Sequence, residues 1–161
     1  LTQYNTNGSI PGEGVAFFML SGHKGTHDMA VLKSMKSFYK PRDHTEVVDT
    51  VNNFIAVAGL TLKDVDLLML GLNGDHNTDK VYYRLKDDLF NETPCSYFKH
   101  LCGEYDTSAS FALWLASMML KRQQIPASVS LGGIIPGKIN HVVIYNHLRG
   151  VNHTLYLLER C

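Results

Sequence analysis

The sequence lacks an excess of charge of either sign, because fifteen basic and fifteen acidic residues cancel over 161 residues. No run of like charge offers the basic surface that phosphate backbones or anionic lipid headgroups require, so we expect neither a nucleic-acid partner nor a membrane partner. Long apolar runs are also missing, since none reaches the ~20 residues of a membrane-spanning helix. The first residues do not follow the pattern of a signal peptide.

Cysteine is scarce as well. Cys95, Cys102 and Cys161 form no Cys-x-x-Cys pair, and an odd number leaves one thiol without a partner. This argues against a disulfide-stabilised fold and for a reducing compartment. We therefore expect a cytoplasmic protein.

What the sequence does contain is a strongly apolar helix. Asp106, Thr107 and Ser108 are candidate N-caps, and residues 109–120 are then almost wholly apolar. A surface helix would carry a polar stripe, so this one is expected to be buried on nearly all sides. Such a helix indicates a layered α/β architecture.

Hydrophobic periodicity places further elements around this helix. Alternating and continuous apolar runs predict strands, and apolar residues spaced three and four apart predict helices. From residue 47 onward the order is α-β-α-β-α-β-β, which favours a layered α/β domain. The expected strands are 15–20, 28–38, 65–70, 96–98, 141–145 and 153–158, and the helices 47–58, 77–89 and 109–124, with loops at 71–75 and 146–152 and a connection at 128–138.

Five short segments follow one another along the chain. They are GEGVA at 12–16, AGL followed by DVD at 58–66, KHLCGE at 99–104, IPASV at 125–129, and NHL followed by Gly150 and Asn152 at 146–152. In this order they resemble motifs of the β-ketoacyl synthases of the thiolase-like superfamily. The resemblance extends from Gly12 to Arg160 and concerns the latter part of those proteins.

The resemblance implies a fold and a domain organisation. The superfamily's fold is a pseudo-dimer of two similar halves layered αβαβα, so residues 1–161 are expected to form a single C-terminal-type half-domain, a mixed sheet with a buried helix. One half alone leaves an apolar helix face uncovered. We therefore expect a longer protein, a second copy of this chain or a different partner chain to cover that face.

The resemblance also assigns site positions, and here the sequence departs from the family. Two histidines of the family donate hydrogen bonds to the thioester enolate, and Asn73 and Glu104 occupy their places. An Asn amide can still donate, whereas an ionised Glu cannot. Lys99 stands at the position of an active-site Lys, and Asn146, His147 and Leu148 stand in the active-site loop, which has lost glycines.

Two classes of function follow from this resemblance. The first is a catalytically degenerate partner like the chain-length factors of fatty-acid or polyketide-type assembly, working with acyl-carrier protein and a synthase subunit or a second copy of itself. The second is part of an active synthase, a decarboxylating Claisen condensation enzyme whose nucleophilic Cys lies outside this chain. The loss of both histidines favours the first. Neither requires a cofactor or a metal.

Other candidate residues have simpler interpretations. Cys102 could be a nucleophile with Glu104 as its base, but a small buried side chain is the commoner role. Glu104 itself is open to interpretation as a functional acid, as a filler of an inactive pocket, or as a carboxylate near a helix N-terminus. The histidine groups His23–His27–Asp28 and Asp75–His76–Asp79 match no zinc signature, and of His141, His147 and His153 the second is the best candidate for the site.

Overall fold

A computed structural model of the protein describes residues 8–132 and 137–161. A six-stranded sheet forms its centre, in the order β1-β6-β5-β2-β3-β4. β2 pairs in parallel with β3 and β5, and the remaining pairs are antiparallel. The strands are β1 (Val31–Tyr39), β2 (Leu67–Leu70), β3 (Cys95–Tyr97), β4 (Ser130–Leu131), β5 (His141–Leu148) and β6 (Asn152–Glu159).

Helices cover both faces of this sheet. The side chains of Asp43 and Asp75 accept hydrogen bonds at the N-termini of the two helices that follow them, and the second of these helices begins at His76, one residue before the predicted start at 77. None of the described helices is both long and apolar enough to span a membrane. The helices are α1 (His44–Val57), α2 (His76–Leu89), α3 (Lys99–Cys102) and α4 (Ser108–Arg122), with short 3₁₀ turns η1 (Leu62–Asp64) and η2 (Ala127–Val129).

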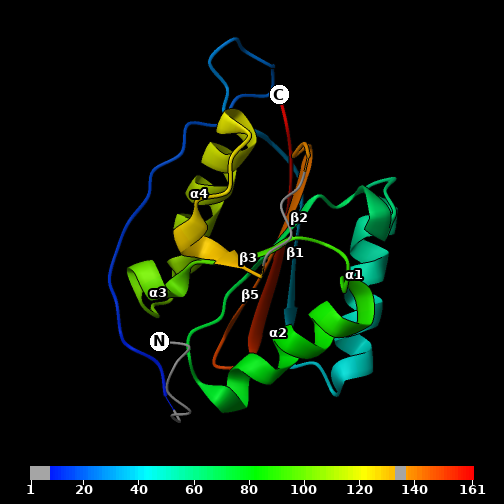
Figure 1. Ribbon diagram of the computed structural model, residues 1–161, viewed down its shortest axis with the longest axis vertical. Helices are drawn as coiled ribbons and strands as arrows, with labels where there is room; N and C mark the ends of the chain where they lie inside the picture. The colour runs from blue at the N-terminus through cyan, green and yellow to red at the C-terminus, as the bar shows by residue number, and fades with distance from the viewer. Residues whose placement is uncertain (1–7, 133–136) are drawn as a thin grey trace.

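The sheet separates two hydrophobic cores. Figure 1 shows α1 and α2 on one face of the sheet and α3 and α4 on the other. Alternate residues of β2 point to opposite faces, so Leu68 and Leu70 join the core under α1 and α2, while Leu67 and Met69 join the core under α4. The strand is buried at every position, as a parallel strand between two helical layers requires.

Helix α4 is buried most deeply on the side that faces the sheet. Ala112, Ala116 and Leu120 are fully buried against the sheet, whereas Trp114 on the outer side is 43% exposed. Trp114 is the only exposed residue among 109–120, so the predicted burial on nearly all sides is confirmed except on the outer side of α4. Its apolar outer face lacks a second layer among the described residues, which is the situation expected of half of an αβαβα arrangement.

The predicted buried strand at 15–20 is also wrong. This stretch forms no strand, and the side chains of Val15, Phe17, Met19 and Leu20 are 75, 91, 100 and 76% exposed. In Figure 1 the N-terminal segment runs outside α3 and α4, away from the sheet. The apolar pattern describes a strand correctly only when a neighbouring strand is present, and the described part of this chain provides none there.

The predicted loop at 146–152 is instead the end of a hairpin. β5 continues through Leu148, and the backbone N–H of Val151 donates to the carbonyl of Leu148 over 3.0 Å. Arg149 and Gly150 have φ values of 54° and 66°, as a type I′ turn requires. Because the turn is confined to residues 149 and 150, Asn146 and His147 belong to β5 and not to a loop. Residues 133–136 of the predicted connection lie outside the described residues.

Candidate functional site

Three parallel strands end at the same edge of the sheet. Leu70 of β2 pairs with Tyr97 of β3 and with Tyr145 of β5, so the residues that follow each strand lie close together. In open α/β sheets, ligands bind at the carboxyl ends of the strands. This edge brings together Asn73 after β2, Lys99 and Glu104 after β3, and Asn146 and His147 at the end of β5.

Asn73 is held in a tight loop between β2 and α2. The buried carboxylate of Asp79 accepts hydrogen bonds from the backbone N–H groups of Asn73 and Gly74, at 3.1 and 2.9 Å. The side-chain oxygen of Asn73 accepts from the N–H of Asp75 over 2.9 Å. This contact determines the orientation of the amide, because the NH₂ group must then face the other way.

The NH₂ group of Asn73 faces Glu104, which also binds Lys99. Asn73 Nδ2 donates to Glu104 Oε2 over 2.7 Å, and Lys99 Nζ donates to Oε1 and Oε2 over 2.9 and 2.8 Å. Lys99 also donates to the carbonyl of His147 over 3.2 Å and is 1% exposed. The structure thus brings four of the six predicted site residues into one hydrogen-bonded network.

The backbone of Glu104 is fixed by the N-terminal segment. Glu104 N–H donates to the carbonyl of Ile10, and Gly12 N–H donates to the carbonyl of Glu104, at 2.9 and 3.0 Å. Gly103, with φ of 77°, ends α3 and lets the chain turn back toward this segment. A Cβ on Gly103 would lie 2.6 Å from Cα of Gly12, so the two backbones approach as closely as glycines allow.

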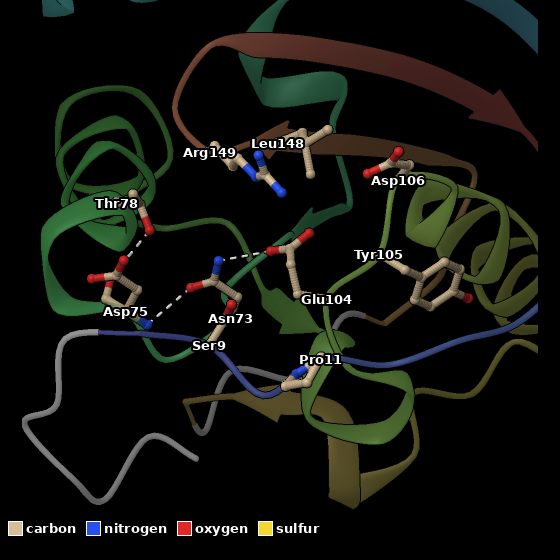
Figure 2. Close-up of a pocket in the computed structure, with 10 residues that line it drawn as sticks. All are labelled: Ser9, Pro11, Asn73, Asp75, Thr78, Glu104, Tyr105, Asp106, Leu148 and Arg149. Carbon is tan, nitrogen blue, oxygen red and sulfur yellow. Dashed lines mark hydrogen bonds between the residues drawn. The ribbon is translucent and has the colours of Figure 1, made fainter.

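A cavity of about 290 Å³ opens beside this network (Figure 2). Figure 2 shows the carboxylate of Glu104 and the amide of Asn73 side by side at its centre, with the Arg149 side chain above them. Leu148 also lies on the wall, whereas Asn146 and His147 do not. The lining residues are Ser9, Pro11, Asn73, Asp75, Thr78, Glu104, Tyr105, Asp106, Leu148 and Arg149.

His147 is packed beneath the site and does not line the cavity. Its ring stacks on Tyr82 with centroids 4.5 Å apart, and its Nε2 lies 3.0 Å from the carbonyl of Thr78. Asn146 is 5% exposed, with its side chain against the backbone of Gly71. Of the three predicted loop residues, then, only Leu148 reaches the cavity wall, because the hairpin turns the other two inward.

Burial dominates the electrostatics of the site. It lowers the pKa of Lys99, which the hydrogen bond and charge of Glu104 oppose. It also raises the pKa of the Asp79 carboxyl, against the two backbone N–H groups that bind it. Removal of Glu104 would therefore leave a buried ammonium group with only a backbone carbonyl to replace its hydration.

The remaining sequence candidates, Cys102 and three histidines, make no hydrogen bond to Asn73, Lys99 or Glu104 among the contacts of the described residues. Cys102 Sγ is 3.5 Å from the carbonyl of Gly103, and burial raises the pKa of its thiol, which disfavours the nucleophilic thiolate. His23 and His27 are exposed. Nδ1 of His141 lies 3.0 Å from the carbonyl of Asp64. Among the residues the structure describes, no group of three or more His, Cys, Asp or Glu side chains could hold a metal ion.

Sequence reasoning missed two residues that shape the site. The sequence pattern places Asp79 only beside His76 in a possible metal group, whereas the structure shows that its carboxylate binds the backbone of the Asn73 loop. An acidic residue in the first turn of a helix is the signal that could have identified it. Arg149 belongs to no recognisable sequence motif, and it could not be predicted because the hairpin turn is what places it at the cavity.

No protein-family model matches this sequence, and no curated protein sequence matches it. Solved structures do match. The ishigamide ketosynthase/chain length factor has a TM-score of 0.69 at 11% identity, over 83% of this chain and 38% of that chain. A ketosynthase in complex with its chain length factor from Xenorhabdus doucetiae has a TM-score of 0.67 at 17% identity, over 82% of this chain and 39% of that one.

A third match is a type II polyketide synthase acyl-carrier protein in complex with its ketosynthase bound to the hexaketide. It has a TM-score of 0.65 at 14% identity, over 84% of this chain and 39% of that chain. This chain spans less than half of the length of each of these three structures. Its six-stranded mixed sheet, with helices on both faces, has the fold of half of a thiolase-like ketosynthase domain.

Proposed function

We propose that this chain is a catalytically inactive, chain-length-factor-like half of a ketosynthase-type assembly in fatty-acid or polyketide-type chain building. The network of Asn73, Lys99 and Glu104 carries the proposal. Decarboxylation of a malonyl thioester needs hydrogen-bond donors that are free to meet the enolate oxygen as its charge develops. In this chain the amide of Asn73 and the ammonium group of Lys99 already donate to Glu104.

Charge argues in the same direction. Asp75, Glu104 and Asp106 place three carboxylates on the cavity wall, against Arg149 on the wall and the buried Lys99 ammonium group, which pairs with Glu104. A malonyl carboxylate would meet like charges there, and its approach would cost free energy in a partly desolvated site. The wall is therefore poorly suited to the acid substrate of a decarboxylating synthase.

The described cysteines offer no nucleophile to this site. Burial raises the pKa of Cys95 to about 11 and also raises that of Cys102. Cys161 is exposed at the C-terminus. Burial therefore disfavours the nucleophilic thiolate at Cys95 and Cys102, and Cys161 does not line the cavity.

Uncovered apolar surface supports a partner chain. Phe17 and Met19 are 91 and 100% exposed on an extended segment, and Trp114 is 43% exposed on the outer side of α4. We propose that a ketosynthase subunit, or a second copy of this chain, covers these residues, and that acyl-carrier protein serves the assembly. The assembled ketosynthases and chain length factors among the similar structures support this arrangement.

A malonyl-carrier-protein decarboxylation assay tests the proposal. We expect no CO₂ release by the chain alone, and no change in the rate of an active ketosynthase partner when Glu104→Ala is introduced here. Turnover by this chain that Glu104→Ala abolishes would show instead that Glu104 takes part in catalysis, and the chain would then be part of an active synthase.

A further inference from the structure

We propose that the Glu104 carboxylate is a tethered anion occupying a site for small carboxylates formed by Lys99 and Asn73. When the carboxylate is removed, this site should bind a free carboxylate of formate or acetate size. The inference deepens the inactive-partner proposal, in that it gives the physical means by which the site is kept from an anionic ligand. The inference can be false while the inactive-partner proposal is true, because it concerns only what Lys99 and Asn73 bind.

The donors converge from different elements on one carboxylate. Lys99 Nζ lies 2.9 and 2.8 Å from the two oxygens of Glu104, and Asn73 Nδ2 lies 2.7 Å from Oε2. Charge-assisted hydrogen bonds of this length are among the stronger polar contacts in proteins. The two oxygens of the Glu104 carboxylate therefore accept three hydrogen bonds, which is the arrangement expected of a bound carboxylate ligand.

Both donors are held in place by contacts that do not involve Glu104. Lys99 Nζ also donates to the carbonyl of His147 over 3.2 Å. The Asn73 amide is oriented by the N–H of Asp75, and its backbone by the carboxylate of Asp79. Loss of the Glu104 side chain should therefore leave the donors close to their present positions.

The site can be reached from solvent. Glu104 and Asn73 both line the cavity of about 290 Å³, and the Glu104 side chain is 12% exposed. Truncation to Ala would add the volume of a carboxymethyl group to this cavity, next to the two donors. Acetate has the same heavy atoms as the carboxymethyl group that Glu104→Ala removes, so its size and charge match those of the missing group.

The tether is rigid in the native chain. The backbone N–H and carbonyl of Glu104 are both bound by the segment from Ile10 to Gly12, and Gly103 contacts Gly12 directly. The carboxylate cannot move away from the donors by a shift of its backbone without breaking this bridge. We therefore expect the wild-type chain to exclude free carboxylates from the site.

Chemical rescue of the full chain tests this inference. Glu104→Ala should unfold at a lower temperature than wild type. Formate or acetate at ~50 mM should raise its Tm by about 2–4 °C for a Kd on the order of 10 mM, since a ligand that binds only the folded state stabilises it. Chloride at the same ionic strength should not. In ¹⁵N-labelled protein, the Asn73 side-chain amide signals should shift saturably with formate in the variant only.

Matched variants separate this site from general salt effects. Asp106→Ala removes another carboxylate of the same cavity and should show no formate effect. Glu104→Gln fills the site and should not be rescued. Lys99→Met combined with Glu104→Ala removes the cation and should abolish the response to formate.

Three results would overturn the inference. The first is a folded Glu104→Ala or Glu104→Gly whose Tm and Asn73 amide signals respond to formate no more than to chloride. The second applies if neither variant stays folded in chloride, and it is a refolding yield that is equal in formate and in chloride. The third is a wild-type chain that responds to formate as strongly as the variant.

Discussion

The imidazole of His147 stacks on the ring of Tyr82, with centroids 4.5 Å apart and 9° between the planes. Its Nε2 lies 3.0 Å from the carbonyl of Thr78, which can only accept, so Nε2 carries the proton. Gly150 N–H donates to Nδ1 over 3.2 Å. Both ring nitrogens are thus satisfied in the neutral form, and protonation of Nδ1 would lose the bond from Gly150.

This arrangement predicts that acid destabilises the protein through His147. Burial lowers the pKa of this side chain from 6.5 to about 4, and the charges of Lys99 and His153 act in the same direction. The neutral form is therefore favoured by folding, so the contribution is complete above pH 6.5 and is lost as the pH falls toward 4. Urea unfolding should show about 2 kcal/mol of lost stability from this group between pH 7 and pH 5.

His147→Gln provides the comparison, because it removes the titrating group and keeps a polar side chain. Its stability should fall less steeply between pH 7 and pH 5 than that of wild type. His23→Gln, on an exposed loop, serves as the control for histidine replacement. Equal slopes for wild type and His147→Gln would contradict the assignment.

Lys99 and Glu104 should be energetically coupled. Lys99→Met leaves the Glu104 carboxylate without its cation, and we expect a loss of about 2–4 kcal/mol in the free energy of unfolding. Lys99→Met together with Glu104→Gln should recover part of that loss, since neither charge then remains. Urea unfolding of the four proteins gives the coupling as a double-mutant cycle.

An exposed ion pair in the same chain serves as the control. Lys33 Nζ lies 2.6 Å from Glu159 Oε2, but the two side chains are 38 and 35% exposed. Exposed pairs contribute about 0–1 kcal/mol. A coupling energy at Lys99–Glu104 no larger than at Lys33–Glu159 would show that burial does not strengthen the site pair.

The bridge between the N-terminal segment and Glu104 should depend on Gly12. A Cβ on this residue would collide with the backbone of Cys102 and lie 2.7 Å from Cα of Gly103. Gly12→Ala should therefore cost about 1–3 kcal/mol and should speed protease cleavage at 13–30. Gly22→Ala is the control, because no atom lies within 4 Å of a Cβ at that position, and it should change neither the stability nor the cleavage rate. Equal stability and equal cleavage rates for the two variants would exclude a tight bridge at Gly12.

The exposed apolar segment should drive association. Phe17→Asp with Met19→Asp should weaken association of the chain with itself or with a ketosynthase subunit, because a charge in an apolar interface is costly to desolvate. Size-exclusion chromatography with light scattering measures this. Val57→Asp, which alters another exposed apolar residue, should have no effect. A wild-type chain that is monomeric at all concentrations and binds no ketosynthase would contradict the partner proposal.

Local patterns identified the elements whose partners lie within the chain. The apolar faces of α1 and α2 repeat with helical periodicity and β2 is a continuous apolar run, and the structure confirms all three elements. The same logic failed at 15–20, because an apolar run indicates a buried strand only if a neighbouring strand exists. β4 was not recognised, since its two residues carry no period.

The sequence by itself determined the α/β class, because element periodicity is a local property, and it predicts through the resemblance that Asn73 and Glu104 stand at the positions of two family histidines. Only the tertiary structure decided what Asn73 and Glu104 contact. Lys99 and Glu104 are five residues apart, yet Asn73 and His147 reach them through the parallel pairing of β2 with β3 and β5. The direction of each hydrogen bond in that network depends on this pairing, on Asp79 and on the bridge to Gly12, none of which a local pattern contains.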